Sequence, residues 1–440
     1  MYRKGLDWLK KWKSKPNRKP LIIKGARQVG KTWLMKEFGR QCYKKTVYIN
    51  FDANKEMAVL FKENIEPKRL ILGLEIYAKQ QISAEDTLLI FDEVQEVPQA
   101  LSSLKYFCEE APEYHIVCAG SLLGIALHNG TSFPVGKVDF LELYPLSFEE
   151  FLQAIDEEPL VSLLHKKDFA MIKSFKDRYI ELLKLYYFIG GMPEAVSYYT
   201  QYKDINEVRA IQKRILEAYE QDFSKHAPND IVPKIRLVWN VIPSQLAKET
   251  KKFIYGQIRK GARAKDFETA IMWLSDCGLI HKINRVTVPN LPLKAYEDIS
   301  IFKLYMLDVG LLSCMTGIQQ QILLLGSDIF KESKGALTEQ YVLQQMIAGE
   351  DWKICYYTND RNSAEIDFLV DDGAQVIPLE VKASENLKAK SLKAYCQKYK
   401  PQIAVRTSMS DYRKDTWLTN IPLYCIQELK SIVSDLSDDV

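Results

Sequence analysis

The sequence has no long hydrophobic run and no apolar segment at its N-terminus. No stretch reaches the roughly 18 consecutive apolar residues that a transmembrane helix needs, so we expect no membrane partner. The first residues, MYRKGLDWLKKWKSKPNRKP, are basic, and lysines separate their apolar side chains. A signal peptide would need a continuous apolar core there. The sequence therefore predicts a cytoplasmic protein.

Cysteine pairs are also missing. The eight cysteines are spread along the chain, none forms a CxxC pair, and no histidine cluster lies near them. This spacing argues against a cysteine zinc site and against a disulfide framework. Internal repeats and low-complexity stretches do not occur either. We expect free thiols in an ordinary globular protein.

The distribution of charge is more informative than its sum. The 440 residues carry a formal net charge of +3, and this length predicts two or three domains. Residues 231–290 contain 11 Lys or Arg against 4 Asp or Glu, and residues 381–413 contain 8 against 2. Such basic regions can bind nucleic acid, but solvated helix faces have the same composition. Both interpretations stay open.

Residues 25–32 match the complete pattern of a phosphate-binding loop, Gly, any four residues, then Gly-Lys-Thr. Glycines allow the backbone to wrap so that successive N–H groups point at phosphate oxygens. We expect Lys31 to reach the β- and γ-phosphates and the Thr32 hydroxyl to bind Mg²⁺. The pattern predicts ATP and Mg²⁺ as cofactors. The predicted nucleotide-binding residues are Gly25, Ala26, Arg27, Gln28, Val29, Gly30, Lys31 and Thr32.

The surroundings of this loop agree with the pattern. Residues 21–23 form an apolar run before it, and residues 32–40 have apolar side chains at helical spacing. A second apolar run, residues 88–91, ends in Asp92 and Glu93. We predict that Asp92 holds Mg²⁺ and that Glu93 is the general base for the attacking water. The alternative is a glycine-rich turn and an unrelated acidic strand end. It would require the two motifs to occur in this order and structural context by chance.

Strand and helix signals alternate in the first part of the chain. This alternation predicts a parallel sheet, with nucleotide at the carboxyl ends of its strands. The predicted strands are residues 21–24, 46–51, 87–91, 115–119 and 138–144. Ser147 and Glu150 then form a capping-box pattern, which starts a mostly helical stretch that is interrupted at residues 190–193.

Helices then precede a predicted β-hairpin, residues 279–288 and 303–307, as they do in a winged helix. Residues 265–276 would be its recognition helix. Several side chains of this helix are instead typical of a core, namely Phe267, Ile271, Met272 and Trp273. Reading of DNA and a packing or oligomerisation role therefore both remain open.

A second group of charged residues lies on a later predicted hairpin, residues 364–370 and 375–382. With an Asp-Gly turn between the strands, Glu365 would pair with Glu380. Side chains alternate between the faces of a strand, so one face is polar and the other apolar. The expected polar face holds Glu365, Asp367, Glu380 and Lys382, with Glu339 on the preceding helix.

Carboxylates on adjacent strands can hold Mg²⁺ or Mn²⁺, and a nearby lysine can activate water or stabilise charge. An Asp followed by Glu-x-Lys is the arrangement of restriction-endonuclease-like nucleases. The predicted nuclease residues are Asp367, Glu380 and Lys382 as catalytic groups, and Asp367, Glu380 and Glu339 as metal ligands. An inactive nuclease-derived fold and a solvated sheet face with ion pairs are the alternatives.

The motifs together resemble prokaryotic ATPases of the AAA superfamily that carry a C-terminal domain of unknown function with a restriction-endonuclease-like core. The matching segments follow the family's order over nearly the whole chain. They are GARQVGKT (25–32), LLIFDEVQ (88–95), CAGSLLG (118–124), FPVGKVDFLELYPLSFEEF (133–151), GGMPEAV (190–196), YMLDVGLL (305–312) and GALTEQYV (335–342), with the EID and EVK pairs. The resemblance implies that Ser121 lies near the sensor position, although a loop-capping role is an alternative. Many relatives have Gly-Arg where this chain has Gly136-Lys137, which puts an arginine finger there in doubt.

The predicted fold class is α/β, a P-loop NTPase parallel sheet with a helical lid, then a winged-helix-like module and a small α/β nuclease-like domain. The predicted domains are an AAA-type ATPase core (1–146), a helical lid (147–228), a winged-helix-like module (229–325) and a restriction-endonuclease-like domain (326–440). We predict a Mg²⁺-dependent ATPase that couples its nucleotide state to DNA-binding C-terminal modules. The alternatives are a nucleotide-gated switch that binds a protein partner, with an inactive nuclease-like domain, and an ATP-dependent DNA nuclease. An oligomer is compatible with each.

Overall fold

The computed structural model describes residues 1–120, 133–248, 251–318, 330–349, 352–359, 364–385 and 389–438. The chain forms two compact units. The first unit is Met1–Tyr144 with Asp276–Gly278, and the second is Pro145–Ser275 with Leu279–Val440. Within the described ranges, no helix is both long and apolar enough to pass through a membrane.

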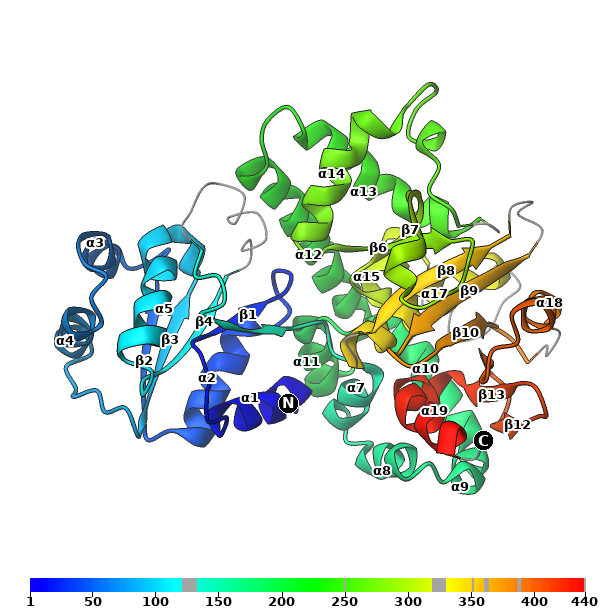
Figure 1. Ribbon diagram of the computed structural model, residues 1–440, viewed down its shortest axis with the longest axis horizontal. Helices are drawn as coiled ribbons and strands as arrows, with labels where there is room; N and C mark the ends of the chain where they lie inside the picture. The colour runs from blue at the N-terminus through cyan, green and yellow to red at the C-terminus, as the bar shows by residue number, and fades with distance from the viewer. Residues whose placement is uncertain are drawn as a thin grey trace. The chain divides into compact units, whose positions relative to one another are not determined.

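The first unit is built on a parallel five-stranded sheet in the order β2-β3-β4-β1-β5 (Figure 1). Its strands are β1 (Leu21–Lys24), β2 (Lys45–Asn50), β3 (Thr87–Asp92), β4 (His115–Ala119) and β5 (Asp139–Glu142). Its helices are α1 (Lys4–Lys13), α2 (Lys31–Cys42), α3 (Lys55–Glu63), α4 (Pro67–Ala78), η1 (Val94–Glu96) and α5 (Pro98–Glu110). The parallel sheet is confirmed, and every predicted strand of it is present with small differences at the ends.

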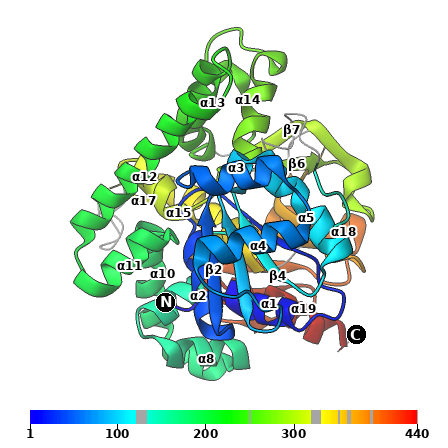
Figure 2. The ribbon, with the colours of Figure 1, turned by 90° about the vertical axis from the view of Figure 1, so that its left-hand side faces the viewer.

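Helices cover both faces of this sheet, which explains the continuous apolar run in β3. Leu89 and Phe91 belong to a core that includes apolar residues of α3, α4 and α5. Those three helices lie together on one side of the sheet (Figure 2). Leu88 and Ile90 alternate with the first pair and are equally buried, on the face where α2 contacts β3. A strand buried on both sides needs apolar residues at every position.

Helices open the second unit. They are α7 (Phe148–Ala154), α8 (Glu158–Lys166), α9 (Phe169–Ser174), α10 (Lys176–Ile189), α11 (Pro193–Tyr202), α12 (Ile205–His226), α13 (Val232–Leu246), η2 (Tyr255–Gln257) and α14 (Ala264–Asp276). The predicted capping box starts α7, since Glu150 N donates to Ser147 Oγ at 3.2 Å and Ser147 N donates to Glu150 Oε2 at 2.9 Å. The predicted interruption separates α10 from α11. There a Cβ on Gly190 would lie 2.1 Å from Asp308 Oδ2, so only glycine fits.

The rest of the second unit forms an eight-stranded mixed sheet in the order β12-β13-β11-β10-β9-β8-β6-β7. Its strands are β6 (Ile280–Val286), β7 (Glu297–Met306), β8 (Lys353–Thr358), β9 (Glu365–Asp371), β10 (Val376–Val381), β11 (Val405–Ser408), β12 (Arg413–Lys414) and β13 (Thr419–Pro422). The accompanying helices are η3 (Leu293–Tyr296), α15 (Val309–Met315), α17 (Phe330–Gly349), α18 (Lys390–Tyr399), η4 (Leu423–Glu428) and α19 (Leu429–Asp438).

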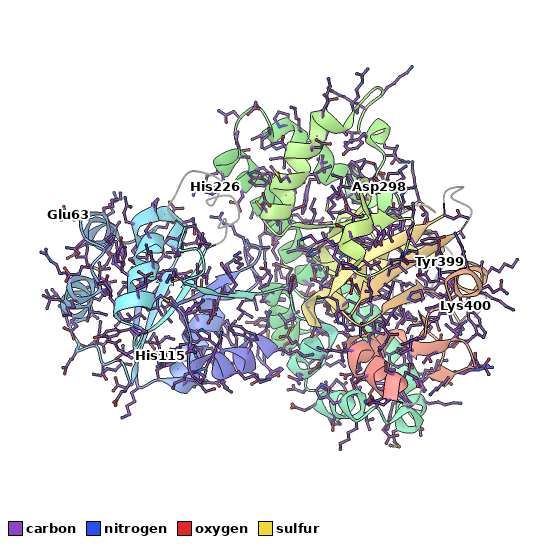
Figure 3. The ribbon with its side chains drawn as sticks, viewed as in Figure 1. Glu63, His115, His226, Asp298, Tyr399 and Lys400 are labelled. Carbon is purple, nitrogen blue, oxygen red and sulfur yellow. The ribbon has the colours of Figure 1, made fainter. Side chains whose placement is uncertain are left out.

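The predicted wing is not a separate hairpin. β6 and β7 pair antiparallel, and an ion pair between Arg285 and Asp298 at 2.6 Å joins them. Asp298 is labelled in Figure 3. However, β6 also pairs in parallel with β8, so the two strands are the edge of the large sheet. Strands on both sides of the predicted boundary at residue 325 therefore belong to one sheet. Met272, which the sequence predicted to be a core side chain, is 53% exposed, whereas Phe267 and Trp273 are buried.

The hairpin of β9 and β10 has a longer loop than the predicted one. Phe368 pairs with Leu379, which puts Asp367 opposite Glu380, so the predicted pairing of Glu365 with Glu380 is wrong by two residues. The reason is local: the Asp372 side chain accepts hydrogen bonds from the backbone N–H groups of residues 374 and 375, closing a four-residue loop. A register shift of two residues leaves each side chain on the same face of its strand.

Candidate nucleotide site and buried acidic site

The phosphate-binding loop connects the end of β1 to the start of α2. Gly25 and Gly30 have φ angles of 135° and 95°, in the region that favours glycine. A Cβ on Gly25 would lie 2.2 Å from the carbonyl oxygen of Leu143, so another residue would clash with the backbone. Gln28 also has a positive φ, 66°. The sequence pattern thus corresponds to a loop whose shape depends on its two glycines.

The Lys31 side chain folds back over this loop. Its Nζ donates hydrogen bonds to the carbonyl oxygens of Gly25 and Ala26, both at 2.7 Å. Burial lowers the pKa of Lys31 to about 8, and the carboxylates of Glu93 and Asp92 oppose that shift. An anion in the loop would favour the charged ammonium, so anion binding and protonation of Lys31 are linked.

The two predicted magnesium ligands meet at the carboxyl end of the sheet. Thr32 Oγ1 donates to Asp92 Oδ2 at 2.6 Å, and Asp92 is 3% exposed. Tyr48 OH donates to the same oxygen at 2.9 Å. Burial raises the pKa of Tyr48 to about 12, with Asp92 adding to the shift, so this hydroxyl stays a donor. The sequence did not predict a role for Tyr48, because that role depends on the pairing of β2 with β3.

Glu93 follows β3 in a left-handed conformation, with φ of 50°. Such a conformation is uncommon for a residue with a side chain, and it turns Glu93 out of the strand. Gln95 Nε2 donates to Glu93 Oε2 at 2.6 Å. A second residue missed from sequence therefore orients the predicted base. The only signal for it was its place two residues after Glu93 in the DEVQ segment.

The sequence also drew attention to Ser121 and Lys137. Ser121 lies outside the described residues, so its sensor role stays a prediction. Lys137 Nζ forms an ion pair with Glu109 Oε1 at 2.8 Å inside the same unit. The hydrogen bond with Glu109 raises the pKa of Lys137.

The predicted polar face of the second unit is a buried ion cluster, not a solvated surface. The register of β9 and β10 puts Asp367 and Glu380 on one face, and Glu380 is only 4% exposed. Asp367 Oδ2 accepts a hydrogen bond from Val381 N at 2.7 Å. Lys382 Nζ, directly after β10, lies 2.6 Å from Glu380 Oε1. This face is thus partly covered, since the side chains of Glu365 and Lys382 are 25% and 33% exposed and that of Glu380 only 6%.

Two lysines that the sequence analysis did not single out complete this cluster. Lys251 forms an ion pair with Glu339 of α17. Lys303 of β7 is fully buried, and its Nζ lies 2.5 Å from Glu365 Oε1 and 3.8 Å from Glu339 Oε2. Tyr305 OH also donates to Glu339 Oε2, at 3.1 Å. The only sequence signal for Lys303 was a lone lysine ahead of an apolar strand.

The charges of this cluster perturb one another. Although Asp367 keeps some exposed surface, desolvation raises the pKa of its carboxyl group to about 7, and Glu339 adds to the shift. Burial alone would also raise the pKa of Glu339, but Lys251 and Lys303 lower it to about 2. Among the described residues, these carboxylates do not form a group of three with all ligand atoms within 4.8 Å. Two of the predicted metal ligands, Glu339 and Glu380, form ion pairs with lysines instead.

A basic turn precedes α14. Its exposed cations are Arg259, Lys260 and Arg263, and Lys265 in the first turn of α14 adds a fourth. The exposed positions of α14 that follow include Glu268, Thr269 and Met272, which offer no positive charge. The positive charge of this region is therefore concentrated in the turn and at the start of α14, and not along the rest of the helix face.

Three segments of the chain match known domain families. Residues 17–152 match a family described as an AAA domain. Residues 180–322 match a domain of unknown function (DUF8612), and residues 334–426 match another domain of unknown function (DUF4143). Comparison with curated proteins gave no match.

Two solved structures are similar over much of the chain. A Walker-type ATPase of Pyrococcus abyssi is 14% identical with a TM-score of 0.44, covering 72% of this chain and 95% of that chain. The ORC1 protein of Aeropyrum pernix, in complex with DNA, is 12% identical with a TM-score of 0.26, covering 72% and 91%. Neither degree of similarity carries a functional argument. Residues 17–152 are therefore similar to an AAA domain, and they contain the phosphate-binding loop around Lys31.

Proposed function

We propose that this protein is a Mg²⁺-dependent ATPase whose nucleotide state is coupled to a DNA-binding surface of the second unit. The observation that carries the ATPase is the 2.6 Å hydrogen bond between Thr32 Oγ1 and Asp92 Oδ2. These two groups hold Mg²⁺ in P-loop NTPases. The match of residues 17–152 to an AAA domain supports the same proposal.

Each residue of the nucleotide site has a separate task in this proposal. The N–H groups of the loop and the Lys31 ammonium bind phosphate oxygens. Thr32 and Asp92 offer the hard oxygen ligands that Mg²⁺ prefers, and the bound ion would neutralise charge on the phosphates. Glu93, held by Gln95, accepts the proton of the attacking water.

Two substitutions test the ATPase. Lys31→Ala should abolish ATP binding and hydrolysis, whereas Lys44→Ala, at an exposed position of the same unit, should leave both unchanged. Glu93→Gln should still bind ATP but hydrolyse it about 100-fold more slowly, with exposed Glu96→Gln as its control. Unchanged hydrolysis in purified Lys31→Ala protein would refute the ATPase. Equal hydrolysis in Glu93→Gln would remove only Glu93 as the base.

The DNA-binding surface in this proposal is the turn before α14 together with the first turn of that helix. Four exposed cations lie within a few residues there, which suits contacts with the phosphate backbone. The helix that follows exposes few groups able to read base edges, so we expect little sequence specificity. Nucleotide-dependent binding would then act on DNA of many sequences.

Salt dependence distinguishes this surface from a protein-binding one. We would replace Arg259, Lys260, Arg263 and Lys265 with glutamine and measure DNA binding by fluorescence anisotropy at several salt concentrations. Each lost phosphate contact should lower the slope of log K against log salt by about 0.9. The matched control replaces four exposed cations of the first unit, Lys62, Lys68, Arg69 and Lys105. No DNA binding by the wild type at low salt, with or without ATP, would favour the nucleotide-gated protein switch.

The acidic site is, in this proposal, an inactive relative of a nuclease centre. Lys251 and Lys303 supply the positive charge next to Glu339 and Glu365 that a divalent cation would otherwise supply. We therefore expect no cleavage when the protein is incubated with Mn²⁺ and single- or double-stranded DNA. Cleavage that disappears in Asp367→Ala would establish the nuclease alternative. Cleavage that persists in that variant would come from a contaminant.

A further inference from the structure

Three metal-binding side chains from separate elements of the second unit meet at one point. They are Glu149 of α7, His165 of α8 and Glu428 at the end of η4, and their ligand atoms all lie within 4.8 Å of one another. His165 Nε2 is 2.9 Å from Glu149 Oε1 and 3.8 Å from Glu428 Oε1. None of these residues takes part in the nucleotide site or in the buried acidic site.

We propose that this triad binds a divalent transition-metal ion of the zinc or manganese type. One imidazole nitrogen with two carboxylate oxygens is a donor set suited to such ions. With metal–ligand distances near 2.1 Å, neighbouring ligand atoms on one ion are about 3.0–3.4 Å apart. The observed separations of 2.9 and 3.8 Å need a shift of a few tenths of an ångström.

The charges of the triad favour an ion over a simple hydrogen bond. The Nε2 atom of an imidazole carries at most one proton, which cannot serve two carboxylates equally. The side chain of Glu149 is only 1% exposed, so an ion bound to it would be shielded from solvent on that side. A divalent ion in place of that proton would contact the nitrogen and both carboxylates at once. The side chain of His165, 49% exposed, leaves a coordination position for water.

The frame that holds these ligands does not depend on the ion. Glu149 N donates to the Gln427 side chain at 3.1 Å, which ties α7 to η4 next to Glu428. The capping box of Ser147 and Glu150 fixes the first turn of α7, which carries Glu149. Helices α7 and α8 both contact η4. The ion would therefore join the start of the helical region to a segment more than 250 residues later in the sequence.

Metal titration of the full chain tests this site. The titrant is Zn²⁺ or Mn²⁺ alone, followed by calorimetry, with chelator-treated wild type, His165→Gln and Glu428→Gln. Both variants should lose one binding equivalent or bind it about 10–100-fold more weakly. Lys166→Gln and Glu158→Gln, exposed neighbours on α8, are the matched controls and should bind as the wild type does.

The comparison between variants separates this site from other metal-binding groups of the chain. Zn²⁺ bound by cysteines, or Mn²⁺ bound at Asp92, would be the same in all five proteins. Equal stoichiometry and affinity in wild type and His165→Gln would overturn the proposal, as would a wild type that binds neither ion at micromolar concentration. Glu428→Gln is included as a second variant because the Glu428 side chain is partly exposed. Circular dichroism would report any loss of structure in either variant.

Discussion

Replacing Lys303 with methionine should destabilise the second unit. The Lys303 side chain is 0% exposed, and its Nζ lies 2.5 Å from Glu365 Oε1 and 3.8 Å from Glu339 Oε2. Methionine keeps much of the volume but leaves buried carboxylates without this cation, which costs about 3–5 kcal/mol in comparable pairs. Because Lys251 still pairs with Glu339, we expect the lower end, about 3 kcal/mol. For a unit of this size that corresponds to a midpoint about 6 °C lower.

Differential scanning calorimetry of the full chain would measure the shift in the transition of the second unit. Lys282→Met, at an exposed position of neighbouring β6, is the control and should shift the midpoint far less. Removing a partner charge in the double variant Lys303→Met/Glu365→Gln should recover at least half of the loss, since the uncompensated carboxylate is then gone. A Lys303→Met protein as stable as the wild type would refute the argument that the cluster depends on this cation.

Two further predictions concern the nucleotide site. Tyr48→Phe keeps the ring under Lys36 but removes the hydrogen bond to Asp92. The Mg²⁺ concentration for half-maximal hydrolysis should therefore rise about tenfold. An unchanged Mg²⁺ dependence would exclude Tyr48 as a positioning residue. Gln95→Ala removes the hydrogen bond that the Gln95 amide donates to Glu93 Oε2, so kcat should fall while ATP affinity and Mg²⁺ dependence stay the same. Steady-state kinetics would measure both, and an unaltered kcat would show that Gln95 does not orient the base.

The nucleotide site could be predicted from sequence because most of it is local. The loop of residues 25–32 is contiguous, and Asp92 follows an apolar strand whose type is plain from composition. Tyr48 could not be predicted in the same way. Its hydroxyl reaches Asp92 only because β2 and β3 are neighbours in a sheet whose strand order is not the order of the chain. Strand order depends on how helices cover the sheet, which no short motif encodes.

The acidic site shows a different limit. Strand alternation predicted that Asp367 and Glu380 share a face, and the two-residue error in register left that face unchanged. The alternation of side chains along a strand does not indicate which other segments cover the polar face of the hairpin. Lys251 and Lys303 come from segments far from the hairpin in sequence, and they changed the interpretation from a solvated metal site to a buried ion cluster. Long-range ion pairs of this kind depend on the whole fold of the second unit.

The stability of the second unit should also depend on pH through Asp367. Its pKa is about 7 in the folded chain, mainly because of burial, against about 3.9 for an ordinary aspartate. Between these values the folded state binds more protons than the unfolded state, so stability falls as pH rises. The contribution of Asp367 is complete below about pH 4 and is lost as pH passes 7.

The contribution of Glu339 to the pH dependence of stability has the opposite sign, and it falls in a lower pH range. Its pKa is lowered to about 2 by Lys251 and Lys303 despite burial, so its contribution is lost only as pH falls below about 4. Asp367→Asn mimics the protonated carboxyl group and can still accept the hydrogen bond from Val381 N. The variant should therefore gain stability relative to wild type between pH 5 and pH 8, measured by calorimetry, with exposed Asp438→Asn as control. Parallel stability curves for wild type and Asp367→Asn would mean that this carboxyl group is already ionised at pH 5, and that the two lysines neutralise the whole cluster.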